Sequence, residues 1–332
     1  PGVVTARDEW VVGLSVDQVA DRMRFFTSFY NDYDRQDEEY DTRIKWSEAL
    51  KLRYQKALTE PFEPTSIRRF SYRPYAKHYF YESDLFIDRL GSTDEVFSSS
   101  NAAIAFPNPA STKPFSTLVS QYPIDFHLTG DTQYASRYTS DEHGARLDNI
   151  TDWAVAQFTE RYGDELADAA AGLPAPLDPA APTDARDVIF YYVYAVLHHP
   201  AYREKYAQNL KREFPRIPLY DDLAQWAAWG RQLLDFHLHY ETVDPYALER
   251  VEREGNPNRA PVAKLQAHPD TGEIVLDTVT TLRGVPAQAW EYRLGNRSAI
   301  EWVLEYHKER KPRDPTIRAQ FNTYRFADHK ER

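Results

Sequence analysis

The chain has 332 residues, of which 42% are hydrophobic, and its formal net charge is −11. This length accommodates two domains, or one large domain with insertions. The negative charge argues against a protein that binds polyanions without selectivity, although a local group of basic residues could still bind nucleic acid. The sequence contains no Cys, which excludes disulfides, thiolate metal sites and cysteine nucleophiles.

The sequence shows no charged-then-apolar leader, and no apolar run approaches the ~20 residues that a membrane helix needs. We therefore expect a cytoplasmic protein without a membrane partner. The chain starts at Pro1 rather than at Met, and we expect it to be part of a longer polypeptide.

The first 60 residues have helical periodicity. Ser15 precedes an apolar stripe that predicts a helix over residues 15–30. A second amphipathic helix is predicted over residues 41–58, before Pro61. We interpret residues 1–60 as a helical connector.

Residues 61–145 change to short aromatic runs separated by Pro, Ser, Thr and Asn, which indicates a β-rich region. The predicted strands are residues 67–72, 78–81, 102–106, 117–119 and 124–128.

The most informative charge pattern lies in residues 64–81, which contain no acidic residue. The basic residues there are interleaved with aromatic ones and include Arg68, Arg69, Arg73 and Lys77. Such cations anchor phosphates or read guanine edges, and a β-element can enter a major groove. The alternative is an aromatic core strand with a solvated basic face.

Residues 146–332 predict a helical scaffold that ends in a β-hairpin and a helix. Its central segment, residues 188–197, is almost wholly apolar and aromatic, with Asp184 as N-cap and Pro200 after its last turn. The other helices are predicted over residues 151–170, 201–214, 220–237 and 298–309. The hairpin is predicted from residues 264–268 and 273–276, joined by a Pro-Asp-Thr-Gly turn.

A second basic cluster lies near the C-terminus. Its cations, Lys308, Arg310, Lys311, Arg313 and Arg318, are interrupted by Glu309 and Asp314. Because the acids dilute the charge, we interpret this cluster as a solvated terminal loop.

The usual signatures of nucleotide-binding and hydrolytic enzymes are absent from the sequence. His237 and His239 would share one face of a strand but diverge at the end of a helix, so we assign them to packing or capping rather than to a metal. A free-standing enzyme that uses these histidines with carboxylates is the least favoured alternative.

Several segments resemble one family. Residues 187–218 and 289–326, the latter with Ala-Trp-Glu-Tyr, Leu-Gly-Asn-Arg-Ser-Ala and Asn-Thr-Tyr-Arg-Phe, resemble the C-terminal specificity domain of type ISP restriction–modification enzymes. The Tyr-Arg-Pro-Tyr of residues 72–75 is similar to an element of adenine methyltransferase–specificity polypeptides. Residues 2–8 resemble the family's Thr-Gly-Arg-Asp segment, with Ala6 in place of the usual Gly.

The resemblance implies an α+β fold and a non-catalytic target recognition domain that reads double-stranded DNA in phage defence. The longer polypeptide would supply an adenine-N6 methyltransferase and an ATP-driven translocating nuclease as partner domains. S-adenosylmethionine, ATP and Mg²⁺ would bind only in those domains, and this chain would need no cofactor. The β-rich region would then be the DNA-recognition region, and residues 1–60 would connect it to the methyltransferase core.

We expect DNA contacts first from Arg68, Arg69, Arg73 and Lys77, with Arg7 as a weaker candidate. A polar loop adds candidates for base contacts, namely Asn101, Asn108, Ser111, Thr112 and Lys113. The alternative is an interaction scaffold that couples the translocase and methyltransferase modules through aromatic-rich faces.

Overall fold

The computed structural model describes residues 1–34, 39–98, 100–109, 111–173, 177, 183–255 and 258–331. The fold is α+β, which confirms the predicted class. The chain forms two compact units, which we call unit 1 (Pro1–Val3 with Gly91–Asp244) and unit 2 (Val4–Leu90 with Pro245–Arg332). The boundary at Leu90 falls inside the predicted β-rich region, so the strands of residues 61–145 are shared between the two units.

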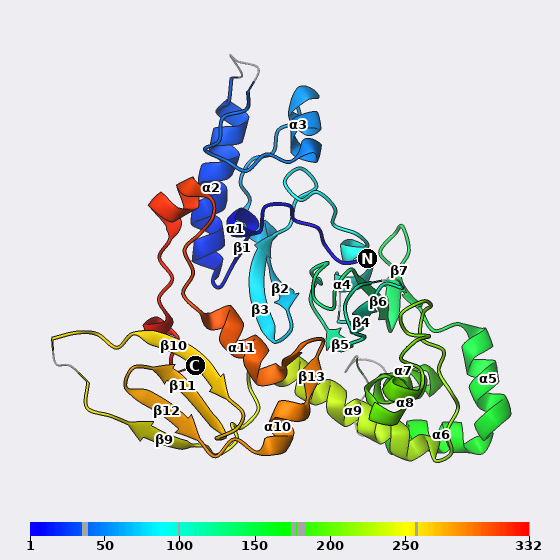
Figure 1. Cartoon of the computed structure of the whole chain (residues 1–332). Coiled ribbons are helices and arrows are strands. Elements are labelled where there is room, and N and C mark those ends of the chain that lie inside the picture. Colours follow the sequence, from blue (N-terminus) through cyan, green and yellow to red (C-terminus); the bar gives the residue numbers. More distant parts are fainter. Residues whose placement is uncertain are drawn as a thin grey trace. The chain divides into compact units, whose positions relative to one another are not determined.

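Unit 1 is organised around two helices, α7 (Ala185–His198) and α9 (Leu223–His239) (Figure 1). Asp184 accepts hydrogen bonds from the backbone N–H groups of Arg186 and Asp187, which forms a capping box at the predicted start of α7. The buried residues of α9 recur at helical spacing and include Leu223, Ala227, Gly230, Leu234 and Leu238.

The two helices touch at Gly230. A Cβ atom at this position would lie 1.8 Å from the carbonyl oxygen of Tyr191 on α7. Only glycine allows the two backbones to approach so closely. The residue that the sequence places on the apolar stripe of α9 therefore determines the separation of the two helices.

The other helices of unit 1 differ from the predictions in length. The helix predicted over residues 151–170 is two helices, α5 (Asp152–Tyr162) and α6 (Asp164–Gly172), because Gly163 adopts a φ of 56° between them. The helix predicted over residues 201–214 is the shorter α8 (Pro200–Lys205), which continues as turns.

The described strands of unit 1 form one three-stranded and one two-stranded antiparallel sheet, after a short helix α4 (Thr93–Phe97). In the first sheet, β4 (Ala103–Pro107) lies between β5 (Leu118–Ser120) and β6 (Thr132–Ser136). In the second, β7 (Tyr138–Ser140) pairs with β8 (Arg146–Asp148). The strand predicted over residues 124–128 is wrong, since that segment forms turns and only a bridge between Val3 and Asp125.

The N-terminal part of unit 2 contains α1 (Asp8–Val11), α2 (Val16–Asp32), α3 (Glu48–Gln55) and a small sheet that packs against α1 and α2. That sheet has the order β1 (Val12–Gly13), β3 (Ala76–Tyr81) and β2 (Ile67–Arg73), with a single turn of 3₁₀ helix, η1 (Pro64–Ser66), before β2.

The two helix predictions for this part have different outcomes. Ser15 caps α2 as predicted, because its hydroxyl accepts from the N–H of Gln18. The helix predicted over residues 41–58 begins only after Ser47, whose hydroxyl accepts from the N–H of Leu50. A capping serine starts a helix at its own position and excludes the residues before it.

The C-terminal part of unit 2 contains a four-stranded antiparallel sheet in the order β10, β11, β12 and β9 (Figure 1). Its strands are β9 (Glu249–Glu252), β10 (Ala263–His268), β11 (Glu273–Asp277) and β12 (Thr280–Arg283). The predicted hairpin is β10 and β11, and the strands β12 and β9 were not predicted.

Four helical elements and a short hairpin follow this sheet in the described part of the chain. They are α10 (Ala287–Glu291), the pair β13 (Arg293–Leu294) and β14 (Arg297–Ser298), α11 (Ala299–His307), and the single-turn η2 (Ile317–Phe321) and η3 (Phe326–Asp328). Ser298 and Glu301 form a capping box that starts α11 where the sequence predicts it. Among the described residues, none of the helices combines the length and the apolar character needed to cross a bilayer.

Candidate nucleic-acid interface

The hairpin of β2 and β3 distributes its basic residues over two faces. Residues directly opposite each other in an antiparallel pair share a face. Arg69 faces Tyr79 and Ser71 faces Lys77, whereas Arg68 faces Phe80. The register therefore places Arg69 and Lys77 on one face and Arg68 on the other.

Arg69 and Lys77 are both partly exposed. The guanidinium carbon of Arg69 lies 5.0 Å from the ring centroid of Tyr79, so the cation is supported by an aromatic face. This face of the hairpin combines two cations and an aromatic ring.

Arg68 and Arg73 are each held by a carboxylate. Arg68 pairs with Glu82 at 2.6 Å. Arg73 lies 3.4 Å from Asp8, donates to the carbonyl of Tyr72 at 2.6 Å and covers the ring of Tyr72 at 4.0 Å. The acid-free stretch of sequence thus receives acidic partners in the folded unit.

Arg7 is a structural residue here, which corrects its place among the expected DNA contacts. Its side chain has no exposed surface and donates to the carbonyl of Phe86, the hydroxyl of Ser47 and the carboxylate of Asp88. Burial lowers the pKa of Arg7 to about 10, and Asp88 opposes this effect. A guanidinium enclosed in this way offers no donor to a ligand at the surface.

Ala6, just before Arg7, has a φ of 58°. This is the left-handed conformation that glycine adopts without steric cost. The geometry gives a physical reason for the Gly that the resemblance in residues 2–8 leads us to expect at this position.

Asn101 is also structural, which corrects a second expected contact. The residue is buried, and its amide donates to the carbonyls of Val96 and Tyr138 and accepts from the N–H groups of Ala102 and Tyr138. These bonds use both ends of the amide, as a buried polar group requires.

The rest of the polar loop lies at the surface of unit 1, between β4 and β5. Asn108, Thr112 and Lys113 are exposed and Ser111 is partly exposed. The backbone N–H of Ser111 donates to the carbonyl of Asn108 at 3.0 Å, which closes a turn. These four residues belong to unit 1, whereas the β2–β3 hairpin belongs to unit 2.

Unit 2 contains a cavity of about 1540 Å³ beside the turn of this hairpin. Its lining includes Tyr72, Arg73 and His78 from the hairpin, and Arg310, Lys311 and Arg313 from the C-terminal basic cluster. These two basic groups lie more than 200 residues apart in the sequence, and no sequence pattern predicts that they meet.

His78, in the lining of this cavity, makes the stability of unit 2 depend on pH. The ring is buried and lies 5.0 Å from that of Tyr72. Burial, with help from the charges of His307, Arg73 and Arg69, lowers the pKa of His78 to about 3.

Because this folded-state pKa is below the unfolded value of 6.5, the unfolded chain binds the extra proton between these values. The stabilisation is complete above pH 6.5 and decreases as the pH falls, by ~2 kcal/mol between pH 6.5 and pH 5. Denaturant titrations at these two pH values should show the loss, and His78→Phe, which keeps an aromatic ring, should show a smaller one. An equal loss in the variant would contradict this assignment.

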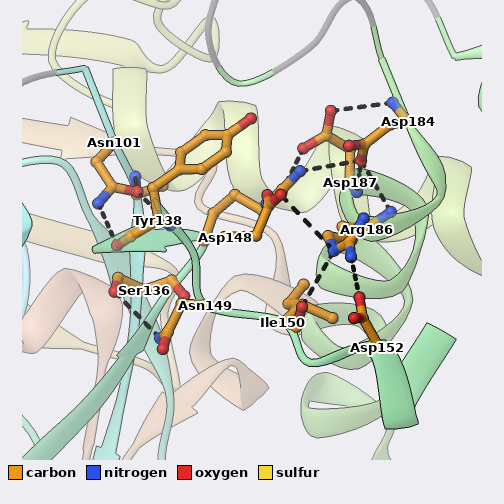
Figure 2. Close-up of polar contacts among 12 residues, drawn as sticks. Asn101, Ser136, Tyr138, Asp148, Asn149, Ile150, Asp152, Asp184, Arg186 and Asp187 are labelled. Carbon is orange, nitrogen blue, oxygen red and sulfur yellow. Dashed lines mark hydrogen bonds and ion pairs between the residues drawn. The ribbon is translucent and has the colours of Figure 1, made fainter. Parts of the chain in front are cut away.

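Unit 1 contains a buried ionic cluster where the strands meet the start of α7 (Figure 2). Arg137 is fully buried, and its guanidinium donates to Asp187 at 2.7 Å, to Asp184 at 2.9 Å and to Asp148. Arg186 adds contacts to Asp152 and to the carbonyl of Ile150. The side chain of Arg137, the residue between β6 and β7, thereby joins β8 to the capping box of α7.

His237 of α9 is partly buried and packs against the ring of Tyr194, whereas His239 is exposed. The Nδ1 of His237 lies 2.5 Å from the hydroxyl oxygen of Tyr194, and burial lowers the pKa of His237 to about 4. His239 contacts the carbonyl of Asp235 one turn earlier. In the part of the chain that the structure describes, no group of three His, Asp or Glu side chains could hold a metal ion.

Comparisons with known proteins identify the family. The Type ISP C-terminal specificity domain matches residues 1–332. No curated protein sequence matches the chain.

Three solved structures are similar over nearly the whole chain. In a DrdV–DNA complex, the similar region is 40% identical, covers 99% of this chain and 33% of DrdV, and has a TM-score of 0.89. The Type ISP restriction–modification enzyme LlaGI, as a nuclease-deletion mutant with a DNA substrate mimic, is 28% identical, with 96% and 30% coverage and a TM-score of 0.76.

The ATP-dependent Type ISP restriction–modification enzyme LlaBIII, bound to DNA, is 25% identical, with 96% and 21% coverage and a TM-score of 0.78. This chain therefore spans about a third or less of each of these proteins. The match of the family over every residue, with the fold shared at 40% identity, leads to one conclusion: the chain belongs to the Type ISP C-terminal specificity domains.

Proposed function

We propose that this chain recognises a specific sequence in double-stranded DNA on behalf of a type ISP restriction–modification enzyme. The observation that carries the proposal is the match to a specificity domain over residues 1–332. The likeness to proteins that were solved with DNA supports it.

The proposal assigns no catalysis to this chain. Methylation of adenine at N6, ATP-driven translocation and cleavage belong to other domains of the same polypeptide, and so do S-adenosylmethionine, ATP and Mg²⁺. The contribution of this chain is to hold the target pairs while the methyltransferase domain receives a flipped adenine.

Two surfaces are proposed to meet the DNA. The surface on unit 2 is the hairpin face with Arg69 and Lys77, from which a β-element would present side chains to a groove of the DNA. On unit 1 it is the surface loop with Asn108, Ser111, Thr112 and Lys113, whose polar groups suit base edges. Arg73 lies at the turn beside the first surface, and Arg68 lies on the opposite face of the hairpin.

Single substitutions on the hairpin should separate base reading from phosphate binding. We expect Arg69→Ala to cost about 1–3 kcal/mol on the preferred sequence and to relax specificity at one position. We expect Lys77→Ala to weaken all duplexes alike and to reduce the salt dependence. Fluorescence binding of the full-length enzyme at two salt concentrations measures both effects.

Arg24→Ala is the matched control, because Arg24 is an exposed arginine on α2 of the same unit with a neighbouring carboxylate, Asp21. Binding that is unaltered in both hairpin variants would remove this face from the proposed interface.

The proposed function itself is tested by selection of binding sites from random duplexes with the full-length enzyme. An enriched sequence that changes when this domain is exchanged for that of another type ISP enzyme is the expected result. Retention of the same sequence after the exchange would overturn the proposal and favour the scaffold alternative.

A further inference from the structure

The C-terminal basic cluster differs in the folded unit from what its composition suggests. We call residues 308–318 the basic segment. In the sequence, Glu309 and Asp314 reduce the net positive charge of this segment. In the folded unit, both carboxylates accept hydrogen bonds from other groups of the chain. Glu309 accepts from the backbone N–H of Phe326 at 2.9 Å. Glu309 remains exposed, but this charge-assisted bond orients its carboxylate toward the backbone of Phe326.

Asp314 accepts hydrogen bonds at both of its carboxylate oxygens. Its Oδ1 accepts from the N–H groups of Thr316 and Ile317 at 2.9 and 3.1 Å, and its Oδ2 accepts from the indole of Trp10 at 2.8 Å. The nearby Glu9 likewise accepts from the N–H groups of Arg313 and Asp314. Hydrogen bonds of Asp314 and Glu9 therefore link the basic segment to α1.

The cations of the same segment point outward. All five are exposed, namely Lys308, Arg310, Lys311, Arg313 and Arg318. Glu305 receives both Lys308 and Arg310. Burial would raise the pKa of Glu305, but the hydrogen bond from Lys308 and the charges of Lys308, Arg297 and Arg310 hold this pKa below its usual value. The single carboxylate of Glu305 thus lies near three cations, so that positive charge exceeds negative charge in this group.

Lys311 and Arg313 contribute most directly to that surplus. Within the described part of the chain, neither side chain forms an ion pair with a carboxylate. Both line the cavity of about 1540 Å³, as do Arg73 and the rings of Tyr72 and Tyr306. Asp8, Glu9 and Asp314 also line the cavity, but basic residues outnumber them in this wall, which combines two segments that are distant in the sequence.

We infer that Lys311 and Arg313 bind the phosphates of one DNA strand along this wall, with Arg310 beside them. The inference rests on the proposed function and deepens it, because it assigns to the basic segment a positioning contact that carries no sequence information. The internally bonded acids keep the segment in place, so the cations are presented without the entropy cost of ordering a free loop.

The test uses the full-length enzyme with the double substitution Lys311→Ala/Arg313→Ala. Both substitutions leave the backbone bonds of the segment in place. The matched control is Arg259→Ala/Lys264→Ala, which removes one arginine and one lysine that are exposed in the same unit and outside the lining of this cavity.

The measured quantity is the slope of log K against log salt concentration, for the preferred duplex and for an unrelated one. Two lost phosphate contacts, at about 0.9 each, should reduce the slope by about 1.8 for both duplexes, with the preferred sequence unchanged. The control should retain the slope of the unmodified enzyme.

Two results would overturn the inference. One is a slope that matches the control, and the other is a changed sequence preference, which would mean that these residues read bases. The proposed function fails by a different observation, namely that the unmodified enzyme prefers no sequence. In that case the slopes on unrelated DNA still decide whether the basic segment binds phosphates.

Discussion

Arg137→Met is expected to destabilise unit 1 by about 3–5 kcal/mol, the range for removing one partner from a buried ion pair. The substitution leaves Asp187, which is fully buried, without its 2.7 Å hydrogen bond from the guanidinium. It also removes the guanidinium that links Asp148 of β8 to Asp184 in the capping box of α7, and leaves the 3.8 Å ion pair between Arg186 and Asp148 as the remaining contact there. Urea denaturation followed by fluorescence measures the loss.

The loss should depend on pH in a specific direction. Burial raises the pKa of Asp187, and Arg137 opposes this effect. Without the arginine, the folded-state pKa of Asp187 lies further above its unfolded value, so the penalty is full at neutral pH and decreases as the pH falls toward ~4. The difference in stability between the unmodified protein and the variant should therefore narrow in acid.

Two further variants make this prediction specific. Arg137→Met combined with Asp187→Asn removes the buried charge as well and should recover part of the lost stability. Arg161→Met removes an arginine whose partner, Asp221, is almost fully exposed, and should cost at most ~1 kcal/mol. A deficit in Arg137→Met as small as that of Arg161→Met would show that the buried cluster does not hold unit 1 together.

Gly230→Ala is expected to destabilise the same unit by ~3 kcal/mol or more, the upper end of the cost of overpacking. The new Cβ would meet the carbonyl oxygen of Tyr191 at 1.8 Å, and a backbone atom cannot rotate away from it. The helices α7 and α9 would have to move apart along their whole buried contact. Thermal or urea unfolding measures the effect.

Gly172→Ala is the control, because a Cβ at this exposed helical position meets nothing within 4 Å. Alanine has the higher helix propensity, so this variant should be neutral or more stable by up to ~1 kcal/mol. The two glycine substitutions should thus have opposite signs. Equal stabilities would contradict the close contact between α7 and α9.

Local signals determined much of the fold in advance. Asp184 and Ser298 each start a helix where the sequence predicts one, because a capping side chain bonds to N–H groups only two or three residues away. The hairpin of β10 and β11 follows from its turn for the same reason. Ser47 and Gly163 were also visible in the sequence, but amphipathic periodicity predicted helices that continue across them. In the structure, Ser47 caps the start of α3, and Gly163 ends α5 with a positive φ.

The candidate site likewise has some features that the sequence predicts and others that only the folded structure shows. The sequence alone determined that the chain resembles a specificity domain, that residues 64–81 carry no acid, and that two basic clusters exist. Only the tertiary structure decided which charges remain available. Arg73 meets Asp8 65 residues away, and Arg7 meets Asp88 81 residues away, so an acid-free stretch is not free of acidic partners.

The basic segment shows the opposite outcome. Its own acids accept backbone and indole donors, which the composition does not reveal, and its cations are left exposed. The physical reason is the sequence separation over which each interaction acts. Caps and turns involve residues only a few positions apart, so they can be read from the sequence. The partner of a charge depends on which distant segment the fold brings beside it.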